Sequence, residues 1–207
     1  LLFVPPAKGG GMEIFMKKST HPNSFSHNTN EYLDAYSCIL KEMICKMTSA
    51  DLSNSISHNF IVQMIPHHKA AIQMSRNVLK YTTNCDIECI ASKIIMEQTQ
   101  NICDMEKALP CCSKKSNHRN DLCASQKQVE KIFQTMFHRM QTAKSCNSID
   151  CNFLWEMIPH HEGAVAFSEI TLEYDICPEL TPILQTIITS QKQGICRMEE
   201  LLRCLSC

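Results

Sequence analysis

The sequence predicts an all-α protein built by tandem duplication of a three-helix unit. Met64-Ile65-Pro66-His67-His68 returns 93 residues later as Met157-Ile158-Pro159-His160-His161, with no insertion between the copies. Around each copy, apolar residues recur at three- and four-residue steps, which is typical of one face of an amphipathic helix. Only 5 of the 207 residues are glycine, so few positions weaken a helix. A fixed internal period of this kind indicates that one folding unit occurs twice.

The repeat also divides the chain into parts. A unit of about 80 residues buries only a modest core, so we expect the two halves to pack on each other as a pseudo-twofold helical bundle. The residues before the first unit are polar and few of them are apolar, which predicts a disordered arm. The expected parts are the arm, the first helical repeat, a linker and the second helical repeat, at residues 1–29, 30–109, 110–123 and 124–207.

The first residues bear on the start and location of the protein. Lys8-Gly9-Gly10-Gly11 directly precedes Met12, and codons for Lys-Gly-Gly can spell a bacterial ribosome-binding site. We therefore expect Met12 to be the native start and residues 1–11 not to be native. From Met12 onward there is no signal peptide, because the chain enters a polar stretch and not an apolar one. This favours a cytoplasmic location, where the 14 cysteines would be mainly thiols or metal ligands and not disulfides.

Composition and motifs argue against several classes of function. The net charge is −1 with basic and acidic residues mixed, which gives no electrostatic case for a nucleic-acid partner. No apolar run approaches the roughly 20 residues that a membrane span needs. The sequence also has no phosphate-binding loop, nucleophile elbow or His-Glu-x-x-His motif. Its unusual feature is instead its sulfur content, with 12 methionines beside the cysteines.

The first helix of the first unit is expected over residues 31–49. In the second unit Ser125 and Gln128 form a capping box, which predicts the start of the equivalent helix there. The second helix follows a polar turn, and the N-cap types Ser57 and Asp150 predict that it begins one residue later in each unit.

Prolines mark the other helices. Pro66 and Pro159 then fall inside the second helix, where a proline kinks a helix at a cost of about 3 kcal/mol; the alternative is that Pro66 begins a new helix. The third helix is expected over 88–109, ended by Pro110. In the second unit Thr181 is the expected N-cap of that helix, with the following proline at its first position.

Methionines and histidines recur at the same inward positions in both units. Thioether and imidazole ligands suit a soft, late transition metal ion, above all Cu(I), whereas a carboxylate-poor site disfavours magnesium, calcium and manganese. Met64 and His68 lie one helical turn apart, close enough to share an ion. We expect one copper site in each half. The candidate ligands are Met43, Met47, Met64, His67, His68 and Met105, then Met136, Met140, Met157, His160, His161 and Met198.

Further residues could support such a site. Gln98 and Gln191 are single polar residues on an otherwise apolar face, and either amide could hydrogen-bond the free ring nitrogen of a ligand histidine. Two pairs of aligned positions exchange one metal-ligand type for the other, which contact with an ion would explain. Cysteine and histidine make up about a ninth of the chain, so chance is the competing explanation. The possible extra ligands are Cys45 with His138, and His58 with Cys151.

Two motifs carry a family resemblance. The pattern Phe-x3-Met-Ile-Pro-His-His-x2-Ala occurs in both units, and Gln-x3-Ile-x2-Met follows it. Through these motifs, residues 32–109 and 125–202 each resemble the ferritin-like family catalogued as domain of unknown function 305. The resemblance implies small helical bundles that are frequently extracytoplasmic, with some members linked to copper binding and resistance. It implies as ligands Met64, His67, His68 and Met105, with Met157, His160, His161 and Met198.

Three functions follow, in order of support. The first is a protein that binds a soft transition metal, most simply copper, for metal buffering or resistance. The second is a metal-free helical module that pairs with a partner or a second copy, because methionine at helical spacing is more often core than ligand. The third, a ferritin-like redox enzyme, is disfavoured: di-iron bundles use four carboxylates, and Glu106, matched by Glu199, is the one acidic residue that is identical in both copies.

Overall fold

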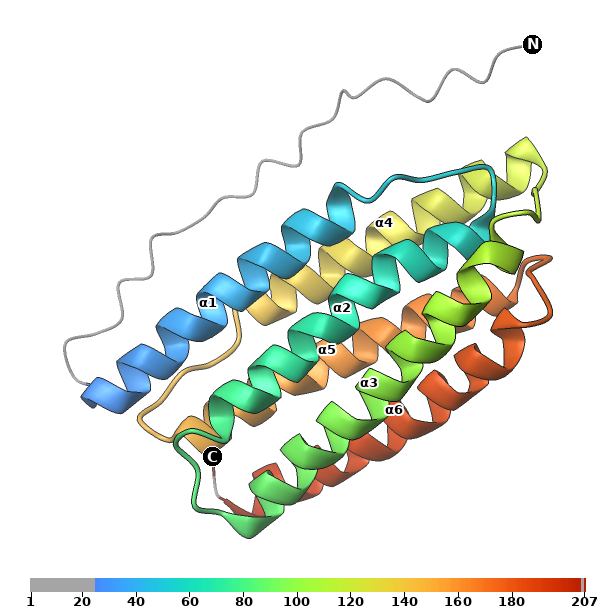
Figure 1. Cartoon of the computed structure of the whole chain (residues 1–207). Coiled ribbons are helices and arrows are strands. Elements are labelled where there is room, and N and C mark those ends of the chain that lie inside the picture. Colours follow the sequence, from blue (N-terminus) through green and yellow to red (C-terminus); the bar gives the residue numbers. More distant parts are fainter. Residues whose placement is uncertain (1–24, 206) are drawn as a thin grey trace.

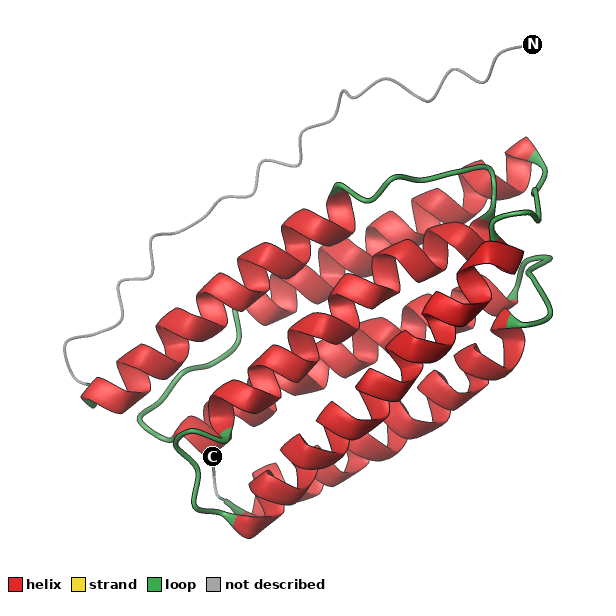
Figure 2. Cartoon of the chain, in the orientation of Figure 1, coloured by secondary structure: helices red, strands yellow, loops and turns green. Residues whose placement is uncertain are grey.

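Six helices joined by short connections make up the computed structural model, which describes residues 25–205 and 207 (Figure 1). No strand occurs among these residues (Figure 2), so the prediction of an all-α protein is confirmed. The expected start at Met12 and the expected arm up to residue 24 lie outside the described part. The helices are α1 (His27–Thr48), α2 (Ile56–Val78), α3 (Cys85–Cys112), α4 (Arg119–Gln141), α5 (Ile149–Leu172) and α6 (Leu180–Cys204).

The helices form two layers of three. In the first layer α1 packs on α2 and α2 on α3, and in the second layer α4 packs on α5 and α5 on α6. Across the layers, α2 faces α5 and α3 faces α6 (Figure 1). The central helices α2 and α5 therefore bury side chains on several sides. None of the six helices has an apolar stretch long enough to cross a membrane.

All six helices begin earlier than predicted, α3 at Cys85 in place of residue 88. Helix α1 begins at His27, inside the segment expected to be a disordered arm. The N-caps of α2 and α5 are Ser55 and Ser148, and not the predicted residues two positions later in each unit. Each serine oxygen accepts the backbone N–H three residues on, at 3.2 and 3.3 Å. The earlier start of α2 also buries Ile56, which is 3% exposed, and apolar burial favours it over capping by Ser57.

The predicted linker over 110–123 is likewise mostly helical. Helix α3 continues through Pro110 to Cys112, because a proline near the end of a helix removes only one backbone hydrogen bond and Cys112 reaches the core, fully buried. Helix α4 starts at Arg119 with His118 as its N-cap, ahead of the predicted capping box. Only residues 113–118 connect the two helices.

The prolines of the repeated motif behave as the main prediction stated. Pro66 lies inside α2 and Pro159 inside α5, so the alternative that Pro66 begins a helix is wrong. Helix α6 begins at Leu180 and its N-cap is Glu179, which corrects the predicted cap at Thr181. The prolines leave α2 and α5 continuous, and the histidine pairs that follow them point into the middle of the molecule.

Candidate metal centre

The two histidine pairs of the repeat meet at the centre of the molecule. The rings of His67 on α2 and His160 on α5 stack with their centroids 3.6 Å apart. His68 lies 5.9 Å from His67, and His161 lies 5.9 Å from His160, ring centre to ring centre. All four side chains are at most 3% exposed. We call these four residues the histidine cluster; it joins what the sequence predicted as two separate sites, one in each half.

Few polar groups contact the histidine cluster. His160 Nε2 lies 3.1 Å from the backbone oxygen of His67; a carbonyl only accepts, so this nitrogen carries the proton and Nδ1 of His160 keeps a free lone pair. Asn101 of α3 places its side-chain nitrogen 3.4 Å from His68 Nε2. These two contacts provide a hydrogen-bond partner for Nε2 of His160 and for Nε2 of His68.

Five other ring nitrogens in the cluster are buried and make no well-formed hydrogen bond among the described residues, although the backbone of His160 and of Met157 interacts with the rings of His67 and His161. They are both nitrogens of His67 and the Nδ1 atoms of His68, His160 and His161. A buried polar atom left unpaired costs about 1–3 kcal/mol, and such atoms are rare in native proteins. Their concentration on four adjacent rings marks the cluster as a place where a ligand would supply the missing partners.

Burial also sets the charge of the cluster. It lowers the pKa of His68 to about 3 and that of His160 to about 4. The pKa values of His67 and His161 also lie well below their ordinary value, because of burial first and the neighbouring histidines second. At neutral pH all four rings are therefore uncharged, which is the form that binds a metal ion.

The predicted methionine ligands are all buried in the core, each at most 3% exposed. Met64 precedes His68 by one turn of α2, and Met157 precedes His161 by one turn of α5. Met136 of α4 also packs closely on α5: a Cβ added to Gly163 would lie 2.1 Å from Met136 Sδ. The glycine therefore lets a sulfur approach the backbone one turn beyond the histidine pair of α5.

The geometry of the nitrogens limits which ion fits. Within the described residues, no three of the histidine nitrogens lie within 4.8 Å of one another. A site made of imidazole alone is thus not formed, and an ion held here in this geometry would need methionine sulfur among its ligands. Mixed thioether and imidazole ligation is characteristic of copper in its soft +1 state.

The two glutamines do not have the predicted role. Gln98 and Gln191 are both buried, but their side-chain oxygens have no partner among the described contacts. The amide that does reach a histidine nitrogen is Asn101, which the sequence analysis missed. Its position 93 residues later is Gly194, where an added Cβ would lie 3.3 Å from His161 Nε2. The sequence offered one signal for this position: Asn101 aligns with Gly194, and each follows one of the two glutamines by about one turn.

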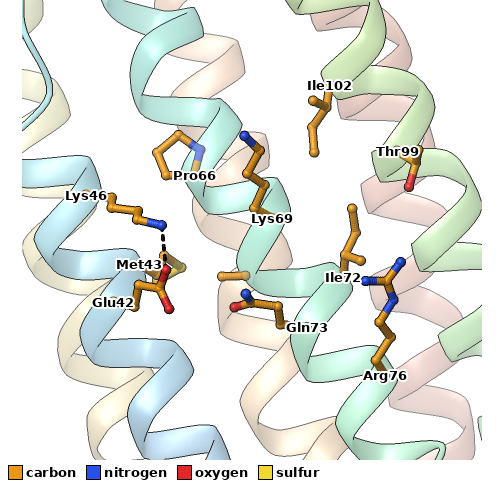
Figure 3. A pocket seen from close by; sticks show the side chains of 11 residues that line it. Glu42, Met43, Lys46, Pro66, Lys69, Ile72, Gln73, Arg76, Thr99 and Ile102 are labelled. Carbon is orange, nitrogen blue, oxygen red and sulfur yellow. Dashed lines mark hydrogen bonds and ion pairs between the residues drawn. The ribbon is translucent and has the colours of Figure 1, made fainter.

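That glycine opens a small cavity between α3 and α6. The cavity has a volume of about 50 Å³ and is lined by Gln98, Gln191, Gly194 and His161, with charged residues at its rim. A larger pocket of about 290 Å³ lies on the outer face of α1, α2 and α3 (Figure 3), and it is lined by Met43 and Pro66 but by none of the four histidines. The cavity at Gly194 is thus the one described pocket that touches the cluster.

The four possible extra ligands do not belong to the cluster. Cys45 and His138 are exposed, and His58 is half-exposed in the first turn of α2. Cys151 forms a disulfide with Cys207, so its sulfur is not available as a ligand. The other twelve described cysteines are free, in keeping with the expectation that the cysteines are mainly thiols or ligands. A shared place in the cluster therefore does not explain the exchange of ligand types between the copies.

A buried carboxyl group near the cluster was also missed. Glu156 lies one turn before His160 on α5, and the Tyr32 hydroxyl donates to its Oε2 at 2.5 Å. Burial raises the pKa of Glu156 well above its ordinary value, with the hydrogen bond from Tyr32 acting in the opposite direction. Glu156 is the one acidic side chain buried among the described residues, so the four carboxylates of a di-iron site are not present there.

The comparisons with known proteins agree on one family. The family described as "Domain of unknown function (DUF305)" matches residues 57–202, which include all four histidines. The crystal structure of a DUF305 fragment from Deinococcus radiodurans is similar in fold, with a TM-score of 0.53 and 22% identity, covering 71% of this chain and 95% of that one. No curated protein matches the chain. Since the matched residues make up well over half of its length, the chain belongs to the DUF305 family.

Proposed function

We propose that this protein binds a soft transition metal ion, with Cu(I) the ion that fits best, and that it buffers copper or contributes to copper resistance. The observation that carries the proposal is the histidine cluster itself: five buried ring nitrogens without a well-formed hydrogen bond, on four neutral histidines. The methionines predicted as ligands are buried in the same hydrophobic core. A ligand-free core would gain stability by replacing such rings with apolar side chains, since unpaired buried polar groups oppose folding.

Charge supports Cu(I) over a divalent ion. The imidazole and thioether groups are all neutral, so nothing in the donor set offsets the charge of an entering cation. Transfer of a charge into a buried site is costly, and the cost is smaller for a monovalent than for a divalent ion. Zinc also prefers four ligands drawn from thiolate, imidazole and carboxylate, whereas no three histidine nitrogens converge within the described part of the chain.

Burial supports storage rather than catalysis. With side chains at most 3% exposed, an ion in the cluster would be shielded from water, and its loading would require α3 and α6 to open near Gly194. Exchange limited by such local opening is slow. A protein that holds copper in this way would lower the free ion concentration without presenting the metal to small substrates.

We also infer that the two layers descend from one duplicated, ferritin-like unit. The contacts of α1 with α2 and of α2 with α3 have counterparts in those of α4 with α5 and of α5 with α6. Residues 93 positions apart meet at the centre, as His67 and His160 do. A pseudo-twofold axis between α2 and α5 would explain both observations. The copper centre would then be formed by the two units together.

A titration tests the proposal. Reduced protein is titrated with Cu(I) against a competing chelator, and we expect the wild type to compete with the chelator. The variant His160→Ala/His161→Ala is expected to lose all of this binding, because the centre is shared. The matched control His118→Ala/His138→Ala removes two exposed histidines and should bind as the wild type does.

Each other outcome has a defined meaning. Retention of half the bound copper in His160→Ala/His161→Ala would indicate two independent sites and contradict the shared centre. Failure of the wild type to compete at all would reject copper binding and leave the metal-free helical module. Circular dichroism of each variant establishes that the loss of copper does not come from loss of the fold.

A further inference from the structure

A second group of potential ligands lies at one end of the bundle, away from the histidine cluster. Cys111 ends α3, while Cys177 and Glu179 lie in the connection from α5 to α6. The Cys177 sulfur is 3.8 Å from the Cys111 sulfur and 2.7 Å from Glu179 Oε2, and the Cys111 sulfur is 3.3 Å from Glu179 Oε1. Among the described residues this is the one group of three cysteine, histidine or acidic donors within 4.8 Å of one another.

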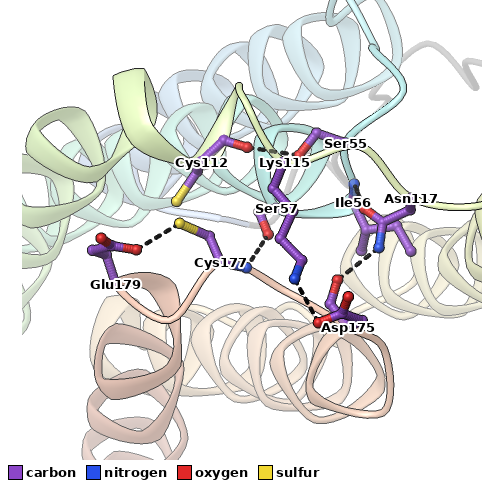
Figure 4. A network of polar contacts seen from close by, with 9 residues as sticks. All are labelled: Ser55, Ile56, Ser57, Cys112, Lys115, Asn117, Asp175, Cys177 and Glu179. Atoms are coloured by element: carbon purple, nitrogen blue, oxygen red, sulfur yellow. Dashed lines mark hydrogen bonds and ion pairs between the residues drawn. The ribbon is translucent and has the colours of Figure 1, made fainter.

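A fourth donor lies beside them. Cys112 is fully buried, and its sulfur points toward that of Cys177 (Figure 4). Cys111 and Glu179 are exposed whereas Cys177 is buried, so the group has two inner and two outer members. Such a site is open to an ion from solvent on one side and held by the core on the other.

The backbone around the inner members is held in place independently of any ligand. Ser57 Oγ accepts the backbone N–H of Cys177 at 2.8 Å, and Ser55 Oγ donates to the backbone oxygen of Cys112 at 2.7 Å. Asn117 bridges the same loops by donating to the backbone oxygen of Asp175 at 2.6 Å (Figure 4). Preorganised ligands of this kind lose less entropy when an ion binds.

The protonation states describe the group before metal arrives. Hydrogen bonds from the two thiols lower the pKa of Glu179, so it is a carboxylate at neutral pH. The hydrogen bond to Glu179 and the neighbouring Cys177 raise the pKa of Cys111 to about 11, and burial with the same carboxylate raises that of Cys177 to about 11. The thiols are thus protonated and donate to the carboxylate. A metal ion would take the place of these protons.

We propose that Cys111, Cys177 and Glu179, with Cys112 as the fourth ligand, form a zinc-binding site separate from the histidine cluster. Zinc binds thiolates and carboxylates in a tetrahedral set of four, whereas a carboxylate is a poor ligand for soft Cu(I). On binding, each coordinating thiol releases one proton to solvent and Glu179 enters as the carboxylate. No oxidant or reductant takes part.

The repeat provides a matched control at the opposite end of the molecule. The positions 93 residues from Cys111, Cys112, Cys177 and Glu179 are Cys204, Leu205, Asn84 and Asp86. Cys204 is exposed at the end of α6, as Cys111 is near the end of α3, but none of its three companions is a thiol and only Asp86 is a zinc ligand type. The site is therefore expected at one end only, and Cys204→Ser matches Cys111→Ser in kind and exposure.

The test is a zinc titration of the full chain, reduced and in competition with a chromophoric chelator. The wild type is expected to hold one zinc ion that Cys111→Ser/Cys177→Ser does not hold, with Cys204→Ser unchanged and Glu179→Gln weaker by at least about tenfold. Cobalt added in place of zinc should give sulfur-to-metal charge-transfer absorption in the wild type and Cys204→Ser, and not in the double variant. His160→Ala/His161→Ala should keep this signal, which separates the result from that for copper.

Two results would overturn the proposal. One is equal zinc stoichiometry and equal cobalt absorption in the wild type and in Cys111→Ser/Cys177→Ser. The other is an equal loss in Cys204→Ser, which would indicate unspecific binding by exposed thiols. If the double variant does not fold, Cys111→Ser decides alone, because that side chain is exposed and its replacement leaves the core intact.

Discussion

At the scale of single residues, the structure shows how small side chains bring sulfur and nitrogen close to the centre. Gly163 lies on α5, two residues after His161, and Gly194 lies on α6. A Cβ added to either glycine would lie close to a neighbouring side chain. At Gly163 the neighbour is the side chain of Met136, and at Gly194 it is the ring of His161. Both glycines therefore contribute space for a candidate ligand, at a cost in helix propensity of about 1 kcal/mol each.

Gly163→Ala is expected to destabilise the protein by about 1–2 kcal/mol. The new Cβ would lie 2.1 Å from Met136 Sδ and 2.7 Å from its Cγ, so the methionine must move within a packed core. Overpacking of this kind costs about 1–3 kcal/mol, less the helix propensity gained. Urea unfolding measures the change.

A second substitution identifies the cause. Met136→Ala/Gly163→Ala should be no less stable than Met136→Ala alone, because the clash has been removed. If Gly163→Ala is equally destabilising in the wild type and in Met136→Ala, contact with Met136 is not the reason for the glycine. Displacement of Met136 in Gly163→Ala should also weaken Cu(I) binding in the chelator titration.

At the scale of elements, the sequence predicted six helices of the right kind and misplaced several of their ends. The interior positions of Pro66 and Pro159 followed from the number of residues between each proline and the preceding polar turn. The caps were wrong because serines stand two residues apart at the start of α2, Ser55 and Ser57, and local chemistry suits either. The burial of Ile56 and the contact of Ser57 with the α5–α6 connection favour Ser55 as the cap. Neither of these contacts can be read from the sequence.

The corrected cap of α5 can be tested directly. Ser148→Ala is expected to lower the free energy of unfolding by about 1 kcal/mol, because it removes the side-chain oxygen that accepts the backbone N–H of Cys151. Asp150→Ala should cost less, since that residue lies inside the first turn and acts through the helix dipole. The measurement is urea unfolding of both variants. A larger loss for Asp150→Ala would return the cap to the position that the sequence first suggested.

At the scale of the whole molecule, the site differs from its prediction because a repeat does not show how its copies pack. The spacing of Met64 and His68 within one helix could be read from the sequence, since helix geometry fixes it. The stacking of His67 on His160 could not, because it depends on α2 facing α5 across the two layers. For the same reason the sequence predicted two separate centres and missed the thiol group at the end of the bundle, whose members come from the end of α3 and from the α5–α6 connection.

The shared cluster makes the stability of the metal-free protein depend on pH. A histidine with a pKa lowered by folding contributes stability above its ordinary pKa of 6.5, and this stability is lost as the pH falls toward the folded value. For His160, with a folded pKa of about 4, the loss between pH 7 and pH 5 is about 2 kcal/mol. The other three histidines are shifted in the same direction, so acid should weaken the metal-free fold steeply in this range.

Urea unfolding at pH 7 and pH 5, with a chelator present, measures this loss. In His160→Gln the difference between the two pH values should shrink by about 2 kcal/mol, because the substituted side chain takes up no proton. His138→Gln, which replaces an exposed histidine, should leave the difference unchanged. Bound Cu(I) should also reduce it, since a ring nitrogen that holds a metal ion cannot accept a proton. Equal pH dependence in the wild type and His160→Gln would mean that folding does not lower the pKa of His160, which would contradict a buried, neutral ring at the centre.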